Sequence, residues 1–159
     1  MSQPLRFELT VEVPAVEAFD TWTLRISTWW PRQHTRSRGR GTEVVIEPRP
    51  GGRIFERTAN GEELHWGWVI AWERPTRFGY RWHITSPREE ATEVQVRFAE
   101  VGAGVTLVTI EHSGFDRLGR EGAPRREANR RHWEMLIPVY ANAVAETSSA
   151  SGSVGRPVS

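Results

Sequence analysis

Alternating apolar and polar residues predict β-strands over most of the chain. Phe7, Leu9, Val11 and Val13 alternate with polar side chains, which is the period of a strand with one buried face. Six further strands are expected, at residues 42–47, 53–58, 64–72, 78–85, 92–99 and 105–112. The connections between most of them are short turn sequences, and such spacing favours an antiparallel meander.

Two short helices are expected after the first strand. Pro14 suits a first helical position, and Val16, Phe19 and Trp22 then recur at the spacing of one helix face. A second short helix is expected to stop at Pro31, because proline cannot continue the hydrogen-bond pattern of a helix. The polar, Arg-rich stretch that follows is typical of a loop.

A long helix is expected near the C-terminus, from residue 125 to residue 146. Its apolar positions follow a helical period and lie on one face: Trp133, Leu136, Ile137, Tyr140 and Val144. Pro138 removes one hydrogen bond of this helix, which predicts a kink.

The order of elements predicts an α+β fold in which a strongly curved antiparallel sheet of six or seven strands wraps around one long helix. Both apolar surfaces are buried only if the sheet curls around the helix. We expect residues 1–146 to form this single domain and residues 147–159, which are rich in Ser and Gly, to be disordered. By analogy with folds of this layout, an apolar cavity is expected between sheet and helix.

Composition narrows the function classes. The 159 residues contain no cysteine, which excludes disulfides and thiolate chemistry, and no apolar run is long enough for a membrane span. The N-terminus lacks the apolar run of a signal peptide, so a cytoplasmic location is expected. A net charge of +1 argues against nucleic-acid binding, and no phosphate-binding glycine motif predicts a nucleotide cofactor.

Eight tryptophans are the unusual number in this composition. Trp66, Trp68 and Trp72 share one strand face, opposite Val69 and Ala71, so strict alternation would point all three outward. An exposed apolar patch commonly marks a partner surface, and a homodimer is one hypothesis. Coverage of the patch by the Arg-rich loop is the alternative.

The chain resembles a known family through an ordered series of motifs at residues 48–53, 67–69, 74–82, 104–106 and 112–115, followed by Trp133. These resemble the AHSA1-like family (activator of Hsp90 ATPase homologue 1-like) of the START/Bet v 1-like SRPBCC superfamily. The resemblance implies a helix-grip fold with a cavity for a small hydrophobic ligand. Residues 29–31 and 111–119 are further similar to the subgroup of calicheamicin self-sacrifice resistance proteins.

On this basis we expect a set of residues to line the cavity. Tyr80 and Trp82 share a strand face with Phe78 and should point toward the helix, where their hydroxyl and indole N–H could orient an apolar ligand. The alternative is that these aromatic residues simply fill the core. The expected lining residues are Trp30, Phe55, Val69, Tyr80, Trp82, His112, Trp133, Ile137 and Tyr140.

No catalytic residue is expected. Glu111, His112 and Ser113 are consecutive, and neighbours on a strand point to opposite faces, so they cannot form a triad. The histidines show no metal-ligand spacing, and no carboxylate pair or cofactor site emerges. We therefore expect a non-catalytic binder of a small hydrophobic, polyketide-like molecule.

Two alternatives remain open. One is a cyclase or aromatase that moves a proton with Tyr80 or His112 in the same cavity. The other is a chaperone activator or stress-related interaction protein. Eukaryotic Hsp90 activators carry an additional N-terminal chaperone-binding domain, and these 159 residues are not expected to supply one.

Overall fold

The computed structural model describes residues 3–84 and 86–154 and confirms the expected α+β architecture. Its strands form one antiparallel seven-stranded sheet in the order β1-β7-β6-β5-β4-β3-β2. The strands are β1 (Leu5–Val11), β2 (Glu43–Ile46), β3 (Arg53–Arg57), β4 (Glu63–Glu73), β5 (Arg77–Trp82), β6 (Thr92–Gly102) and β7 (Val105–Ser113).

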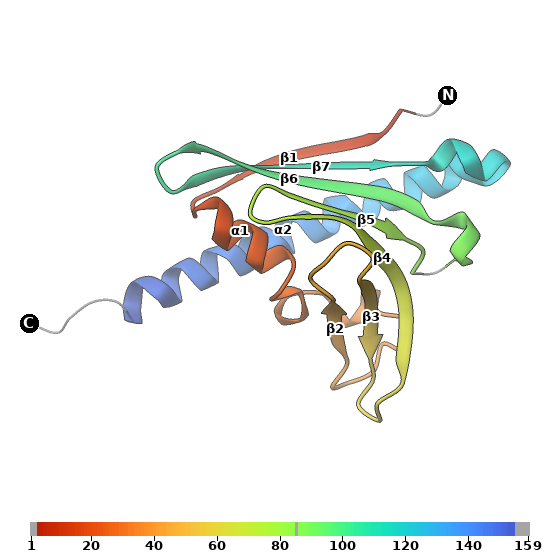
Figure 1. Ribbon diagram of the computed structural model, residues 1–159, viewed down its shortest axis with the longest axis horizontal. Helices are drawn as coiled ribbons and strands as arrows, with labels where there is room; N and C mark the ends of the chain where they lie inside the picture. The colour runs from red at the N-terminus through yellow and green to blue at the C-terminus, as the bar shows by residue number, and fades with distance from the viewer. Residues whose placement is uncertain (1–2, 85, 155–159) are drawn as a thin grey trace, which may run out of the picture.

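Two α-helices and four short 3-10 helices complete the described chain. They are α1 (Ala15–Trp22), α2 (Gly122–Val154), η1 (Ile26–Thr28), η2 (Arg32–His34), η3 (Arg88–Glu90) and η4 (Phe115–Glu121). The second expected short helix is thus a single 3-10 turn. Figure 1 shows α2 running along the sheet, with β2 to β4 turned away from the direction of β1, β6 and β7. This is the helix-grip fold of Bet v 1-like proteins.

Aromatic side chains fill the space where α1 and α2 meet the sheet. The Trp22 ring stacks on Trp133 at a centroid distance of 5.9 Å and meets the edge of Tyr140 at 4.7 Å. The Tyr140 hydroxyl donates a hydrogen bond to the Ala18 carbonyl at 2.7 Å, so its polar end is satisfied inside the core. On α1, Phe19 is fully buried and packs against rings of the sheet.

The expectation of three outward tryptophans on β4 is wrong, because β4 contains register shifts at two places. Each extra residue reverses the alternation of the faces. Trp66 is fully buried and contacts Trp82, while Trp72 meets the edge of the Phe19 ring at 5.0 Å. Only Trp68 lies outside, beneath the Arg88 guanidinium. The surface on which the homodimer hypothesis depended is therefore absent from the described residues.

Gly67 permits the close approach of β4 and β5 at the first of these shifts. A Cβ atom at this position would lie 1.9 Å from the Arg81 carbonyl oxygen, so a side chain cannot be accommodated there without moving backbone.

A buried carboxylate fixes the Arg-rich loop to the sheet. The Glu56 side chain on β3 is fully buried and accepts hydrogen bonds from the backbone N–H groups of Arg36, at 2.5 Å, and Ser37, at 2.9 Å. The Trp66 indole donates a third bond at 2.7 Å. Burial alone would raise the pKa of Glu56, but these hydrogen bonds outweigh it and hold the pKa below its ordinary value.

The long helix extends beyond its expected end. α2 continues through Pro138 and to Val154, into the segment that we expected to be disordered, while residues 155–159 lie outside the described chain. Adding residues to an existing helix avoids the cost of nucleation, which explains how a Ser-rich segment can remain helical. The kink at Pro138 stays a prediction. No described helix has the length and hydropathy that crossing a membrane requires.

Candidate functional site

A crevice lies between β5 and the first half of α2. Its deepest part is a void of about 20 Å³, enclosed mainly by aromatic and aliphatic side chains. The lining residues are Trp30, His34, Tyr80, Trp82, Ile84, Asn129, His132, Trp133 and Leu136. A void of this size holds about one water molecule, so the expected cavity is present but nearly filled by the tryptophans.

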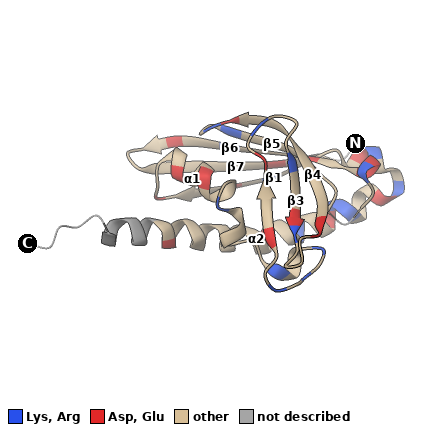
Figure 2. Cartoon of the chain, turned by 60° about the horizontal axis from the view of Figure 1, so that its bottom comes forward, with Lys and Arg blue, Asp and Glu red and all other residues tan. Residues whose placement is uncertain are grey.

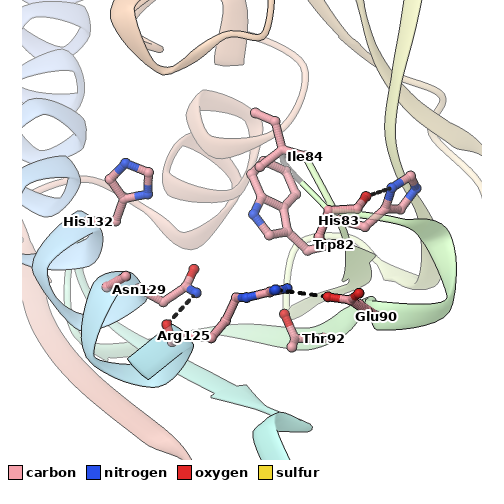
Figure 3. Close-up of a pocket in the computed structure, with 10 residues that line it drawn as sticks. Trp82, His83, Ile84, Glu90, Thr92, Arg125, Asn129 and His132 are labelled. Carbon is pink, nitrogen blue, oxygen red and sulfur yellow. Dashed lines mark hydrogen bonds and ion pairs between the residues drawn. The ribbon is translucent and has the colours of Figure 1, made fainter. Parts of the chain in front are cut away.

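The void adjoins a larger pocket of about 180 Å³ (Figure 3). Trp82, Ile84, Asn129 and His132 line both spaces, so the two lie side by side, and we call them together the crevice. The larger pocket is also lined by His83, Ser86, Glu90, Thr92, Arg125 and Ala128. Small-molecule sites usually measure roughly 300–1,000 Å³, so a ligand here must be small or must displace side chains.

Tyr80 brings an unused polar group into the crevice. The residue is 4% exposed and lines the void, and its hydroxyl has no hydrogen-bond partner among the described residues. The hydroxyl is not enclosed by the protein, because Arg25 Nε is the one buried side-chain polar atom without a partner in the described chain, so it can bond to a water molecule or a ligand atom. Burial raises the pKa of Tyr80 well above its ordinary value, so the side chain remains a neutral phenol.

Two more polar groups face the same space. The Asn129 side-chain amide donates to the Arg125 carbonyl at 2.9 Å, which leaves the Asn129 carbonyl oxygen available as an acceptor. The Trp82 indole N–H has no acceptor within the described part of the chain. Apolar walls with a few polar groups that point inward are the usual composition of a small-molecule site.

Two histidines and an ion pair form the rim of the crevice. The rings of His34 and His132 meet edge to face at a centroid distance of 4.6 Å, joining η2 to α2. Burial lowers the pKa of both rings, and so they are neutral near pH 7. Arg125 and Glu90, which both line the larger pocket, form an ion pair at 2.8 Å (Figure 3).

His112, one of the expected lining residues, does not line the crevice. Its ring is fully buried between Thr92, whose hydroxyl is 2.6 Å from the histidine Nε2, and Trp133, whose indole donates to Nδ1 at 3.0 Å. Burial lowers the pKa of His112 to about 3. A ring that stays neutral and has both nitrogens engaged is unsuited to carry a proton between ligand atoms.

We predict that the His112 ring nitrogens show no titration by NMR as the pH falls from 7 to about 4. The unfolded chain takes up a proton near the ordinary pKa of 6.5, whereas the folded protein does so only near 3. Acidification through this range should therefore lower stability by about 1.4 kcal/mol per pH unit on account of this group. A titration midpoint near 6.5 would contradict the buried, neutral assignment.

Four other expected lining residues lie outside the crevice. Phe55 is buried on the opposite side of β3, covered by the guanidinium groups of Arg53 and Arg57. Val69 and Tyr140 belong to the filled core, and Ile137 is half-buried against it. Of the nine expected residues, the structure brings Trp30, Tyr80, Trp82 and Trp133 together, because they share the inner end of the crevice.

The sequence contains a signal for some of the residues that we missed. Asn129, His132 and Leu136 are spaced by three and four residues around Trp133, so they lie on neighbouring rows of the same helix face. Glu90, Thr92 and Ile84 have no comparable signal, because their positions depend on how the segment between β5 and β6 turns.

The polar groups do not form a metal site or a basic surface. No group of three or more His, Asp or Glu side chains within residues 3–84 and 86–154 is arranged to hold a metal ion. Figure 2 shows acidic and basic residues interspersed along the strands, rather than one basic face.

Comparison with known proteins finds solved structures that share this fold. Two solved structures are 26% identical in sequence: the self-sacrificing resistance protein CalC from Micromonospora echinospora and the anthrahydroquino-gamma-pyrone synthase Txn09. The CalC match has a TM-score of 0.68 and covers 91% of this chain and 96% of that chain. The Txn09 match has a TM-score of 0.60 and covers 89% and 97% respectively.

An Hsp90 activator from Plasmodium falciparum is a more distant neighbour. It is 15% identical, with a TM-score of 0.52, and the match covers 70% of this chain and 73% of that chain, which shows a common fold alone. No curated protein matches the sequence. The family model described as activator of Hsp90 ATPase homolog 1-like protein matches residues 12–137. The chain therefore belongs to the AHSA1-like family of Bet v 1-like proteins.

Proposed function

We propose that this protein binds a small, planar, largely apolar molecule, such as a polyketide-like metabolite, in the crevice between β5 and α2. The observation that carries the proposal is the Tyr80 hydroxyl, which makes no hydrogen bond to the described residues and lies at an aromatic-walled void that Tyr80 lines. A ligand oxygen at this position would supply the missing hydrogen bond.

The shape of the crevice supports a flat ligand that enters from the rim. Trp30 and Trp82 are only partly buried, and their ring centroids are 5.7 Å apart. A modest rotation of either ring would join the void to the pocket of about 180 Å³. The relatives favour the same ligand class, because the name of the synthase denotes an oxygenated aromatic product.

The proposal predicts that filling the pocket abolishes binding. Ala128 is exposed and lines the larger pocket, so Ala128→Trp should block the crevice without disturbing the core. Ala123→Trp places the same side chain at an exposed position in the first turn of α2 that lines neither space of the crevice, and it is the matched control. Titration with 1-anilinonaphthalene-8-sulfonate, followed by its fluorescence, measures binding.

We expect the wild-type protein and Ala123→Trp to bind the probe, and Ala128→Trp to lose at least tenfold in affinity. Equal binding by all three proteins would place the probe elsewhere and contradict the proposal. If the probe binds as expected, native mass spectrometry of protein purified from its own host would identify the physiological ligand.

A second candidate function is an enzyme that cyclises a reactive chain in the same crevice, which the similarity to Txn09 favours. His112 is not suited to the proton transfer because it is sealed in the core, and Tyr80 is not suited to act as a base because its raised pKa keeps it a neutral phenol. His132 is better placed, because it lines the crevice and its lowered pKa keeps it available as a base. A change in the mass of the recovered ligand after incubation would distinguish an enzyme from a binder. For chaperone activation, no residue of the described structure offers specific support.

A further inference from the structure

Three buried side chains form a chain of hydrogen bonds from α2 through the sheet to the crevice. The Trp133 indole donates to His112 Nδ1 at 3.0 Å, and His112 Nε2 lies 2.6 Å from Thr92 Oγ1. The three residues are 6%, 0% and 4% exposed, respectively, so water does not compete for these bonds. We call this chain the Trp133–His112–Thr92 relay.

The chemistry of the groups fixes the direction of each bond. An indole N–H can only donate, so His112 Nδ1 must be the acceptor and carries no proton. A neutral imidazole then has its single proton on Nε2, which donates to Thr92 Oγ1. The Thr92 oxygen is therefore an acceptor in this bond, and its own hydrogen remains free to donate.

The free hydrogen has no acceptor among the described residues. Thr92 is the first residue of β6, opposite Trp82 on β5 in the strand register, and both side chains line the larger pocket (Figure 3). The donor is thus held at the sheet wall of the crevice, beside a second unpartnered donor, the Trp82 indole. From this geometry we propose that Thr92 donates a hydrogen bond to the bound ligand and that His112 is the positioning residue that orients it.

The inference rests on the proposed function and narrows its ligand class. The two donors on the sheet wall, the Thr92 hydroxyl and the Trp82 indole N–H, favour a ligand with an acceptor oxygen on the edge that faces the strands. The remaining walls of the crevice are largely apolar and favour an apolar ring system. An aromatic ketone or quinone has this combination. A purely hydrocarbon ring system would leave both donors unpaired, at a cost in affinity.

A matched pair of probes isolates this hydrogen bond. 9-Fluorenone-4-carboxylate and fluorene-4-carboxylate differ only in the ketone, so the ratio of their dissociation constants reports recognition of the carbonyl. In Thr92→Val, which removes the hydroxyl and keeps the shape, we expect the preference for the ketone to fall by about three- to tenfold. Thr92→Ser retains the hydroxyl and should retain the preference.

Thr106→Val is the control for losing a buried threonine hydroxyl. Thr106 is fully buried on β7 and donates to the Val13 carbonyl at 2.8 Å, and it lines no part of the crevice. This variant should lose stability without changing the ratio. His112→Leu should reduce the ratio through misorientation of Thr92, whereas a merely structural role would weaken both probes equally.

The outcomes are distinct. Failure of both probes to bind the wild-type protein would overturn the proposed function and this inference together. Binding of both probes with an unchanged ratio in Thr92→Val would overturn the inference alone. Should that variant not fold, the infrared ketone band of the wild-type complex provides the test: a band at lower frequency than in an aprotic solvent supports the donor, and an unshifted band refutes it.

Discussion

Replacing Trp133 by Ala is expected to lower the free energy of unfolding by about 3–5 kcal/mol. The indole is 6% exposed and stacks on Trp22, so its removal leaves a large cavity beside the core. The substitution also deprives His112 Nδ1 of its only donor, which adds the cost of an unsatisfied buried acceptor. Urea unfolding measured by circular dichroism gives the change.

Trp68→Ala is the matched control, because Trp68 lies on the outer face of β4 beneath a single guanidinium. It should cost far less than the core substitution. Because the cavity left by Trp133 has the shape of an indole ring, added indole should restore part of the lost stability of Trp133→Ala and none of that of Trp68→Ala. Equal losses in the two variants would show that Trp133 does not pack as described.

Replacing Glu56 by Gln should destabilise the protein by about 2–4 kcal/mol. The carboxylate accepts three hydrogen bonds from N–H groups, and both of its oxygens are used. A glutamine amide has only one acceptor oxygen, and its second polar group is an NH₂ donor. This NH₂ group must take the place of an oxygen that accepted a hydrogen bond, so two N–H donors face each other. The loop from η2 to β2 would lose its attachment to the sheet. Thermal unfolding measures the effect, and Glu62→Gln, at an exposed position, should be nearly neutral.

The pH dependence of the Glu56 variant follows from the lowered pKa of this carboxyl. The ordinary pKa is 4.5, and the folded protein holds it lower, so the charge contributes stability above pH 4.5. This contribution is lost as the pH falls through the folded pKa. The difference between the wild-type protein and Glu56→Gln should therefore be constant near neutrality and shrink in acid. A difference that grew in acid would contradict the hydrogen-bonded, charged state.

Periodicity alone predicted the order of the elements and the helix face that carries Trp133. It also placed Tyr80 and Trp82 correctly, because β5 keeps strict alternation and register with β6. It was wrong for β4, where two register shifts reverse the faces of the strand. The only local indication of these shifts in the sequence is the glycine at position 67. The sequence could not predict the size of the cavity either. That volume is the small difference between the space enclosed by sheet and helix and the volume of the aromatic side chains that fill it.

The buried state of His112 depended on a similar long-range arrangement. The residue ends a strand and could equally have faced solvent, and its burial results from Thr92 on one side and Trp133 on the other. This burial depends on three elements together, so the local sequence around His112 could not decide between a position in the cavity lining and one in the core.

The position of β1 in the sheet has a consequence for biosynthesis. β1 is an edge strand whose only partner is β7, and Leu5 pairs with His112, about 100 residues later in the chain. During translation, β1 leaves the ribosome before the other strands of the sheet and must wait for β7 before it can form a ladder hydrogen bond. The sheet therefore closes only once β7 has been made, and β1 must be kept from pairing with neighbouring chains until then.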